Sequence, residues 1–436
     1  MQEKVDYIDT YYSRTLGAVQ TYPALTGHVD ADVCVIGGGL AGLNTALGLA
    51  ERGLKPVLLE ARRIGWGASG RNGGFVLRGF DAGDIDIPGR VHPDQKFRIM
   101  KGCLDAQDLI RQRSAAYSIP CDIVSGSLAV TWGAADTKEL EDDVHYANDT
   151  FDMGLEFWSR DRVREHCRTP RYHAGVFSKW DFHFHPLRYT HGIAAAAVAQ
   201  GAWIYEQSAA LKIKKDGAGW CVKTAGGRVS ARHVVVCTSV YGSGFDRKLD
   251  FSVFPVQTYV MVTKPVDRHD LDATINTPYC VYDLRFACDY YRVLPDRRIL
   301  WGGRVGLHAE PRDISALMLE DMFKVYPHLK GRVDADISWA GRQAYTPYRM
   351  PVIGQRKPGY WYNTAFGGHG MVPTTLGGEL IARAIAENDS GYRDFARYGL
   401  LFTGGPLGRY VAQAVYGYWC ACDYMRYESP FSRDSA

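Results

Sequence analysis

ADVCVIGGGLAGLNTALGLAERGLKPVLLE, residues 31–60, contains in order a short apolar strand, a glycine turn, a helix and a second strand that ends on an acid. The first strand, 33–36, has no polar face, as expected of a parallel strand that is buried on both sides. Apolar residues then repeat at helical spacing up to Gly53, and the second strand covers 57–59. This order of elements is typical of a dinucleotide-binding βαβ unit.

The glycine turn and the acid predict how a dinucleotide binds to this unit. The turn has the pattern GxGxxG, formed by Gly37, Gly39 and Gly42. The first glycine allows a tight turn, the second lets a pyrophosphate approach the backbone, and the third lets helix and strand pack closely. The pyrophosphate would lie on the helix N-terminus, where unpaired N–H groups and the macrodipole favour an anion. Glu60 stands at the spacing of an acid that binds ribose hydroxyls, which argues against a 2′-phosphate. The unit by itself leaves FAD and NAD equally open.

Composition places the chain among soluble globular proteins of two or three domains. Its 436 residues are 46% apolar and carry 51 basic and 48 acidic side chains, a formal net charge of +3 without a polybasic tract. Nucleic acid is therefore not expected as a partner. There is no run of eighteen apolar residues and no signal-peptide pattern, so we expect a cytoplasmic protein without an integral membrane segment. The ten cysteines lack the spacing of a zinc site, so we expect free thiols and no metal.

Helical and strand-like segments alternate along the rest of the chain. Helical periodicity covers 94–118, 137–151, 189–200 and 374–387. Segments that read as strands are 121–132, 203–205, 211–214, 220–224 and 234–237. Between Phe254 and Arg304, aromatic-rich strands alternate as in an antiparallel sheet with one exposed face. The glycine-rich stretch RRIGWGASGRNGGF, residues 62–75, indicates a loop built for close backbone approach.

Four separated blocks carry a more specific pattern: the βαβ unit, GASGRNGG at 67–74, VVVCTS at 234–239 and TAFGGHGMVPTTLGGELIA at 364–382. Together they resemble the flavoprotein family of glycine oxidase and D-amino acid oxidase, which includes sarcosine oxidase. Three further stretches are YYSRTLGAVQTYPAL at 11–25, RIGWGASGRNGG at 63–74 and WAGRQAYTPYRMPVIG at 339–354. These look like the branch of the family that contains γ-glutamylputrescine oxidase and bacterial L-pipecolate oxidase.

The resemblance implies a mixed α/β and α+β fold. It combines a Rossmann-like FAD-binding domain, with a βαβ unit of the glutathione reductase type, and an inserted antiparallel-sheet domain that binds the substrate. The discontinuous FAD-binding domain would comprise 28–95, 160–255 and 340–436. The substrate-binding domain would comprise 96–159 and 256–339.

The resemblance also implies FAD as the cofactor. The glycine-rich segment 67–74 would pass beside the diphosphate and the ring, and 367–371 would lie against the flavin, followed by a helix N-terminus that stabilises negative charge there. Binding would be non-covalent, because Arg342, Gln343 and Ala344 stand where sarcosine oxidase has its flavin-linked cysteine. The expected FAD ligands are Gly37, Gly39, Leu40, Ala41, Gly42, Glu60, Ala61, Arg62, Gly67, Ala68, Ser69, Arg71, Asn72, Gly73, Gly74, Thr238, Gly367, Gly368, His369, Gly370 and Met371.

The implied reaction is oxidation of a C–N bond in an amino acid, imino acid or polyamine derivative of the L-pipecolate or γ-glutamylputrescine type. A hydride would pass to flavin N5, the imine would be hydrolysed, and oxygen would be reduced to hydrogen peroxide. Such chemistry needs little acid–base machinery, because the cofactor carries the hard step. Two alternatives stay open: a flavin dehydrogenase that passes electrons to a quinone or another carrier, and a non-catalytic FAD-binding sensor.

Candidate substrate-binding residues follow from the same implied chemistry. An arginine can hold a carboxylate by two parallel hydrogen bonds, and the first candidates are Arg349, in YRMP, and Arg304, at the end of ILWGGR. Arg342 is offset by one place from the arginine of glycine oxidase, and such an offset on a strand turns the side chain to the other face. The remaining candidates are His369, expected near the flavin, and three tyrosines that would wall an amine pocket, Tyr259, Tyr290 and Tyr291.

Overall fold

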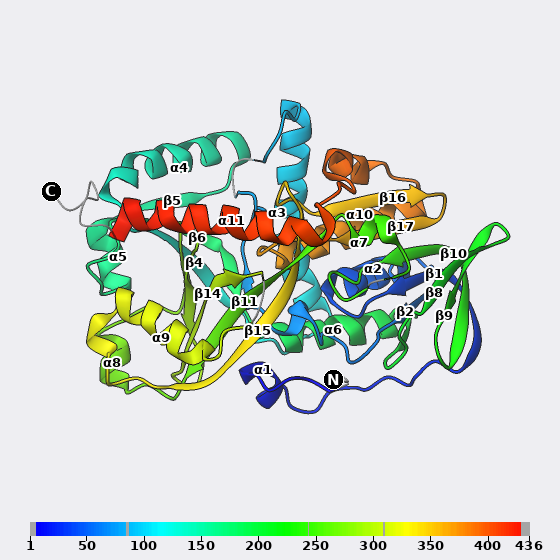
Figure 1. Cartoon of the computed structure of the whole chain (residues 1–436), viewed down its shortest axis with the longest axis horizontal. Coiled ribbons are helices and arrows are strands. Elements are labelled where there is room, and N and C mark those ends of the chain that lie inside the picture. Colours follow the sequence, from blue (N-terminus) through cyan, green and yellow to red (C-terminus); the bar gives the residue numbers. More distant parts are fainter. Residues whose placement is uncertain (1–5, 84–86, 243, 308–309, 429–436) are drawn as a thin grey trace.

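The computed structural model describes residues 6–83, 87–242, 244–307 and 310–428, which form two β-sheets with helices around them (Figure 1). The strands of the first sheet are β1 Gly27–Ile36, β2 Pro56–Leu59, β7 Trp203–Tyr205, β8 Lys212–Asp216, β9 Gly219–Lys223, β10 Gly227–Val236, β16 Val352–Lys357 and β17 Tyr360–Thr364. Their order is β16-β17-β10-β1-β2-β7, parallel except for β16, and β8 and β9 extend antiparallel from β10. Parallel strands β1 and β2, joined by a helix, confirm the predicted βαβ unit.

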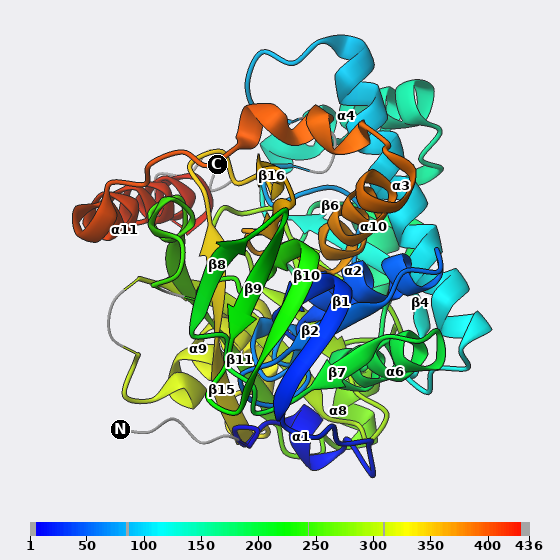
Figure 2. The same ribbon diagram turned by 90° about the vertical axis from the view of Figure 1, so that its right-hand side faces the viewer.

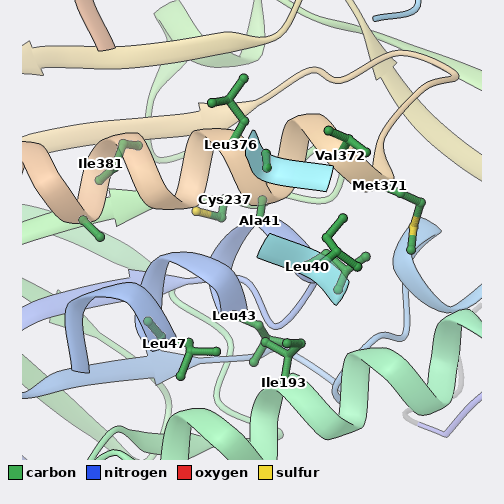
Figure 3. Packing of buried hydrophobic residues seen from close by; sticks show 14 of the residues in the cluster. Leu40, Ala41, Leu43, Leu47, Ile193, Cys237, Met371, Val372, Leu376 and Ile381 are labelled. Atoms are coloured by element: carbon green, nitrogen blue, oxygen red, sulfur yellow. The ribbon is translucent and has the colours of Figure 1, made fainter. Parts of the chain in front are cut away.

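Helix α2 (Leu40–Ala50) joins β1 to β2 and is buried along its whole length. It lies between α6 (Pro186–Ala199) and α10 (Met371–Glu387), and Figure 3 shows Leu43 of α2 beside Ile193 of α6. Small residues bring α2 and α10 close together: a Cβ at Gly48 would lie only 2.9 Å from the Cβ of Ala382. Such dense packing fixes the position of the α2 N-terminus.

The second sheet lies beside the first and has strands from both halves of the chain. They are β3 Phe75–Val76, β4 Val124–Thr131, β5 Leu155–Ser159, β6 Ala174–His183, β11 Phe254–Thr263, β12 Cys280–Asp283, β13 Tyr290–Val293, β14 Ile299–Gly306 and β15 Ala335–Tyr345. Their order is β15-β11-β14-β13-β12-β4-β6-β3, with β5 on β6. Helix α9 (Ile314–Val325) packs on β11 and β15, and the long helix α11 (Gly405–Asp423) crosses in front of the sheet in Figure 1.

The other helices are α1 Tyr11–Arg14, α3 Pro93–Ala116, α4 Thr137–Phe151, α5 Arg160–His166, α7 Arg247–Asp250 and α8 Arg268–Asp272, and the short helical turns are η1 Ala68–Gly70, η2 Ala134–Asp136, η3 Pro327–Leu329, η4 Gly391–Tyr398 and η5 Tyr424–Glu428. Across the described ranges, none of the helices has the length and hydropathy needed to cross a bilayer. All ten cysteines are free thiols.

The predicted fold class is confirmed, and the predicted division into domains stays a prediction, with two strands that pair across its boundaries. Strand β6 falls in 160–255, which we expected in the FAD-binding domain, yet it pairs with β4 and β5 in the second sheet. Strand β15 belongs wholly to the second sheet and crosses the expected boundary at 340. The second sheet is also mixed, because β4 and β12 are parallel. Local periodicity identifies a strand but does not say which distant strand it pairs with.

Candidate functional site

A cavity of about 1550 Å³ lies where the carboxyl ends of β1, β2 and β10 meet the second sheet. Its lining includes Ile36 and Leu59 at the ends of β1 and β2, Thr238 beyond β10, and Thr258 and Gly303 on β11 and β14. Ligands of open α/β sheets bind at such strand ends. The volume exceeds the roughly 300–1000 Å³ of an ordinary small-molecule pocket. The cavity therefore has room for a dinucleotide and a small substrate together.

The glycine turn forms one end of this cavity. Gly37 has φ +114°, and a Cβ there would lie 2.7 Å from the carbonyl oxygen of Cys237. A Cβ at Gly42 would overlap the carbonyl oxygen of Gly37 itself. At the first turn of α2, the Leu40 N–H donates to Oγ of Ser69 over 2.9 Å. The structure thus brings together two of the predicted segments, the GxGxxG turn and the 67–74 loop.

Glu60 lies at the end of β2 with its carboxylate against the glycine turn. Its side chain accepts hydrogen bonds from the backbone N–H groups of Gly38 (2.6 Å) and Arg62 (2.7 Å). Burial raises the pKa of this carboxyl group, and the two hydrogen bonds oppose the rise. Glu60 therefore ties the turn to the β2 end and faces the cavity at the place expected for a ribose-binding acid.

We expect Glu60→Gln to lower both FAD retention and stability. A glutamine offers one acceptor oxygen for two buried N–H groups, and an unsatisfied buried donor costs about 1–3 kcal/mol. Glu206→Gln is a matched control, since Glu206 is also buried and accepts from the N–H groups of Tyr22 and Ile64. Flavin absorbance per protein after gel filtration, together with the melting temperature, tests this. Equal flavin content in both variants would contradict a role for Glu60 in binding.

The 67–74 loop is shaped by its own hydrogen bonds. Asn72 donates to the carbonyl oxygens of Ala68 and Ser69, and its Oδ1 accepts from the Gly74 N–H. Arg71 donates to the carbonyl oxygen of Trp66 and its guanidinium lies 4.1 Å from the centre of the Trp66 ring. Among the expected FAD ligands within the described ranges, the cavity lining leaves out Gly42, Arg71 and Gly74. The expected role of these three residues as direct FAD ligands stays a prediction.

Asp81, which the sequence did not indicate, links the 367–371 loop to the cavity wall by hydrogen bonds. Its carboxylate accepts from the Gly368 N–H (2.8 Å), from Nε of Arg349 (2.6 Å) and from the Tyr345 hydroxyl (3.1 Å). The side chain of His369 donates from Nε2 to the carbonyl oxygen of Leu77 over 3.1 Å. All of 367–371 lines the cavity, and α10 begins there with its N-terminus toward the space.

Both candidate arginines line the cavity, each beside a carboxylate. Arg304 holds Asp321 with two hydrogen bonds of 2.5 and 2.8 Å, and Arg349 holds Asp81. The side chain of Arg349 remains 42% exposed, so it can still reach a ligand. Arg342 is exposed on β15, whereas the neighbouring Gln343 lines the cavity, as the expected one-residue offset requires.

Two of the three candidate tyrosines, Tyr259 and Tyr291, lie outside the lining of the cavity. Tyr291 is fully buried in the second core, stacks on Trp301 with ring centres 4.5 Å apart, and hydrogen bonds through its hydroxyl to Tyr326 over 2.7 Å. Tyr259 is also buried and points toward Gly306. Tyr290 does line the cavity, where it packs on Gly73. Adjacent residues of a strand face opposite ways, so only one of Tyr290 and Tyr291 could reach the site.

The far side of the cavity is formed by the 284–288 loop and by α11, neither of which the sequence indicated. The Phe286 ring stacks on Trp419 of α11 with centres 5.7 Å apart. Two hydrogen bonds hold the helix in place: the Val305 N–H donates to the Tyr416 hydroxyl, and the Ala287 N–H donates to Asp423, both over 3.0 Å. The signal that could have indicated this wall is the aromatic content of 410–427, which is unusual for a surface helix.

A buried ionic cluster supports the 284–288 loop from below. Arg285 donates to both Asp283 and Asp289, and its guanidinium lies 3.7 Å from the centre of the Trp132 ring. Burial raises the pKa of Asp289 to about 7, with Arg285 opposing the rise. Within the described ranges, no group of three or more His, Cys, Asp or Glu side chains is placed to hold a metal ion.

Comparison with known proteins gives consistent matches. The family model described as DAO, FAD dependent oxidoreductase, matches residues 32–384. The chain is 32% identical to the probable oxidoreductase OrdL of Haemophilus influenzae, covering 88% of this chain and 89% of that protein. It is also 32% identical to gamma-glutamylputrescine oxidoreductase of Escherichia coli, covering 90% and 92%. Glycine oxidase of Geobacillus kaustophilus has a similar fold, with a TM-score of 0.71, 18% identity, and coverage of 86% of this chain and 99% of that one.

Proposed function

Because the chain belongs to the DAO family of FAD-dependent oxidoreductases, we propose that it oxidises a C–N bond of an amine or amino acid. The imine that forms would be hydrolysed, and oxygen would be reduced to hydrogen peroxide. The observation that carries this proposal is the single cavity into which the glycine turn, the 367–371 loop and an apolar aromatic wall all open. Such a site can hold a dinucleotide at one end and an organic substrate at the other.

The residues at the dinucleotide end fit FAD. Gly37 and Gly39 have no side chain, so a ligand can approach their backbone closely. The first turn of α2 faces the cavity, and Glu60 lies beside the glycine turn. We propose that FAD is bound without a covalent link. In support, the cysteines that line the cavity, Cys237 and Cys288, have their thiol pKa raised to about 12 by burial, and a protonated thiol is a poor nucleophile.

When bound, FAD supplies the acceptor for the two electrons and the hydrogen that leave the substrate carbon. The chain's own contribution is placement and exclusion of water. The apolar side chains of Phe286, Leu307 and Val415 line the substrate side, and such walls desolvate an amine before it reacts. The α10 N-terminus and the N–H groups of the 367–371 loop lie where negative charge would be stabilised. We propose that His369, which lies in the same loop, positions the flavin ring.

The substrate class follows from the relatives. One of the two relatives that share 32% identity with the chain is a gamma-glutamylputrescine oxidoreductase. We therefore propose γ-glutamyl amines or cyclic imino acids such as L-pipecolate as substrates. A dehydrogenase that uses a quinone or another carrier is the second candidate. We also propose that the protein is located in the cytoplasm, a reducing compartment, because all ten of its cysteines are free thiols.

The test uses purified yellow protein and a panel of cyclic imino acids, γ-glutamyl amines, free polyamines and sarcosine. Under anaerobic conditions a true substrate should bleach the flavin. On admission of air, oxygen uptake and peroxide should match the substrate consumed. Bleaching that only an artificial carrier reverses would replace the oxidase by the dehydrogenase. A flavin that no member of the panel bleaches would favour the non-catalytic sensor.

We expect Arg349→Gln to raise KM selectively for substrates that carry a carboxylate. Loss of a charge-assisted pair costs about 1.5–3 kcal/mol, or about 10- to 100-fold in KM. Free polyamines should keep their KM, because they have no carboxylate. Arg342→Gln is the matched control, since Arg342 lies on the exposed face of the neighbouring strand. If Arg304→Gln shows the selective rise and Arg349→Gln does not, the carboxylate binds at Arg304.

A further inference from the structure

The outer face of α11 and the segments that flank it is apolar and exposed. Among the described residues, ten of the nineteen large hydrophobic side chains that are exposed lie between 401 and 425. They are Leu401, Phe402, Leu407, Tyr410, Val411, Val415, Tyr418, Trp419, Tyr424 and Met425, with exposed fractions from 40% to 73%. Figure 2 shows α11 along the left edge of the molecule. A helix that is apolar on its outer face is normally covered by something.

The exposed residues of α11 form a seam with the spacing of helix pairing. Tyr410, Ala414, Gly417, Ala421 and Tyr424 recur at intervals of four and three residues, so they lie on one face. All five are exposed. Small residues occupy the middle of the seam and tyrosines its two ends. Tyr410 and Tyr424 lie seven residues before and after Gly417, so the seam reads nearly the same in both directions.

Gly417 is not required by the packing of its own chain. A Cβ at this position would meet nothing within 4 Å, and the glycine has ordinary helical backbone. Glycine in a helix interior costs about 1 kcal/mol relative to alanine. No contact within the described chain therefore accounts for a glycine at this position.

We propose that α11 pairs antiparallel with α11 of a second copy of this chain, about a twofold axis near Gly417. In this arrangement Tyr410 of each copy lies beside Tyr424 of the other, and the small residues let the two helices approach closely. The two helix dipoles are then opposed, which is favourable. Arg409, which is exposed, comes near the end of the other helix, where Asp423 and Glu428 lie.

The size and charge of the surface favour a second copy over a lipid surface. Fifteen residues between 401 and 426 are exposed, and the neighbouring Phe251 and Phe286 extend the patch. A stable interface uses about 20–30 residues on each side, so the patch is close to sufficient.

The charge beside the patch disfavours a lipid surface. Next to the C-terminal end of α11, Arg426 pairs with Asp136 at the start of α4, a helix rich in acids, and an anionic membrane would be repelled there. Because Val411 and Val415 of α11 also line the cavity, pairing would bring the second copy close to it.

Sedimentation equilibrium of the full-length protein, purified with its flavin, tests this proposal. We expect a dimer at micromolar concentration, and Gly417→Leu should raise its dissociation constant at least tenfold. The same variant should not lower the melting temperature of the monomer, because leucine is the better helix former and its Cβ would meet no atom of its own chain within 4 Å. Tyr418→Glu, which places a charge beside Gly417 at the edge of the seam, should act in the same direction. Ala195→Leu, at an exposed position of α6, is the matched control and should leave the dimer unchanged.

Two outcomes would overturn the proposal. The first is a wild-type protein that stays monomeric at all concentrations. If that monomer also co-sediments with phosphatidylglycerol vesicles, the surface is a lipid site instead. The second is a dimer that neither Gly417→Leu nor Tyr418→Glu weakens, which would place the interface elsewhere. Flavin bleaching is measured separately, so neither outcome depends on the proposed substrate.

Discussion

Replacing Gly42 by alanine should leave the purified protein largely without FAD and should lower its melting temperature. The added methyl group would overlap the carbonyl oxygen of Gly37, and Val35 of β1 lies 3.3 Å away on the same side. Since α2 is held between α6 and α10, it cannot move aside without disturbing the core. Overpacking of this kind costs about 1–3 kcal/mol or more, and it would displace the N–H groups of the first helical turn.

Gly417→Ala provides the control for the exchange itself. Gly417 is also a helical glycine, but its Cβ would meet open space, so we expect a gain of up to about 1 kcal/mol in monomer stability. Flavin absorbance and thermal unfolding measured on both variants separate the steric effect from helix propensity. A Gly42→Ala protein that retains FAD at the wild-type melting temperature would contradict the close packing of β1 and α2.

Acid should weaken the fold through three buried histidines. Burial lowers the pKa of His183 and His185 to about 3 and that of His191 to about 4, from an ordinary 6.5. Each is therefore neutral in the folded protein and takes up a proton on unfolding when the pH is below 6.5. The stability contributed by each histidine is complete above pH 6.5 and falls by about 1.4 kcal/mol per pH unit below it, until the folded-state pKa is reached. By pH 5 this amounts to about 2 kcal/mol for each histidine.

Buried carboxyl groups act in the opposite direction, so the histidine effect is best read from a variant. Asp289, with a pKa raised to about 7, and Glu60, with a raised pKa, bind protons in the folded protein as the pH falls. We expect the free energy of unfolding of His191→Asn to depend less steeply on pH than that of the wild type, by about 1.4 kcal/mol per pH unit between pH 4 and 6.5. His92→Asn, at an exposed position, controls for the exchange of histidine for asparagine itself. Urea titrations across this range measure the difference, and equal slopes for wild type and His191→Asn would contradict it.

The dinucleotide end of the site could be predicted because its determinants are local in sequence. The order of strand, glycine turn and helix is complete within 31–60, and each glycine has a steric reason that lies a few residues away or on the next strand. The loops 67–74 and 367–371 were found through resemblance, and the structure places both on the same cavity.

The substrate end could not be predicted because its determinants depend on contacts across the chain. Asp81 has an ordinary sequence context, and only the fold brings it to Gly368 and Arg349. The choice between Tyr290 and Tyr291 depends on strand register, which a sequence of alternating aromatics leaves undetermined. The assignment of β6 to the second sheet likewise depends on a partner, β4, that lies some fifty residues earlier in the chain.

The cavity takes its walls from Ile36 at one extreme of the chain and Tyr427 at the other, and this has a consequence for biosynthesis. At about 5–20 residues per second, a ribosome makes the glycine turn roughly 20 to 70 s before it makes α11. A nascent chain therefore displays the nucleotide motif long before the pocket is enclosed. We therefore expect capture of FAD in the enclosed pocket only after α11 has been made. The ratio of apoprotein to holoprotein in the cell would consequently follow the free FAD concentration by mass action.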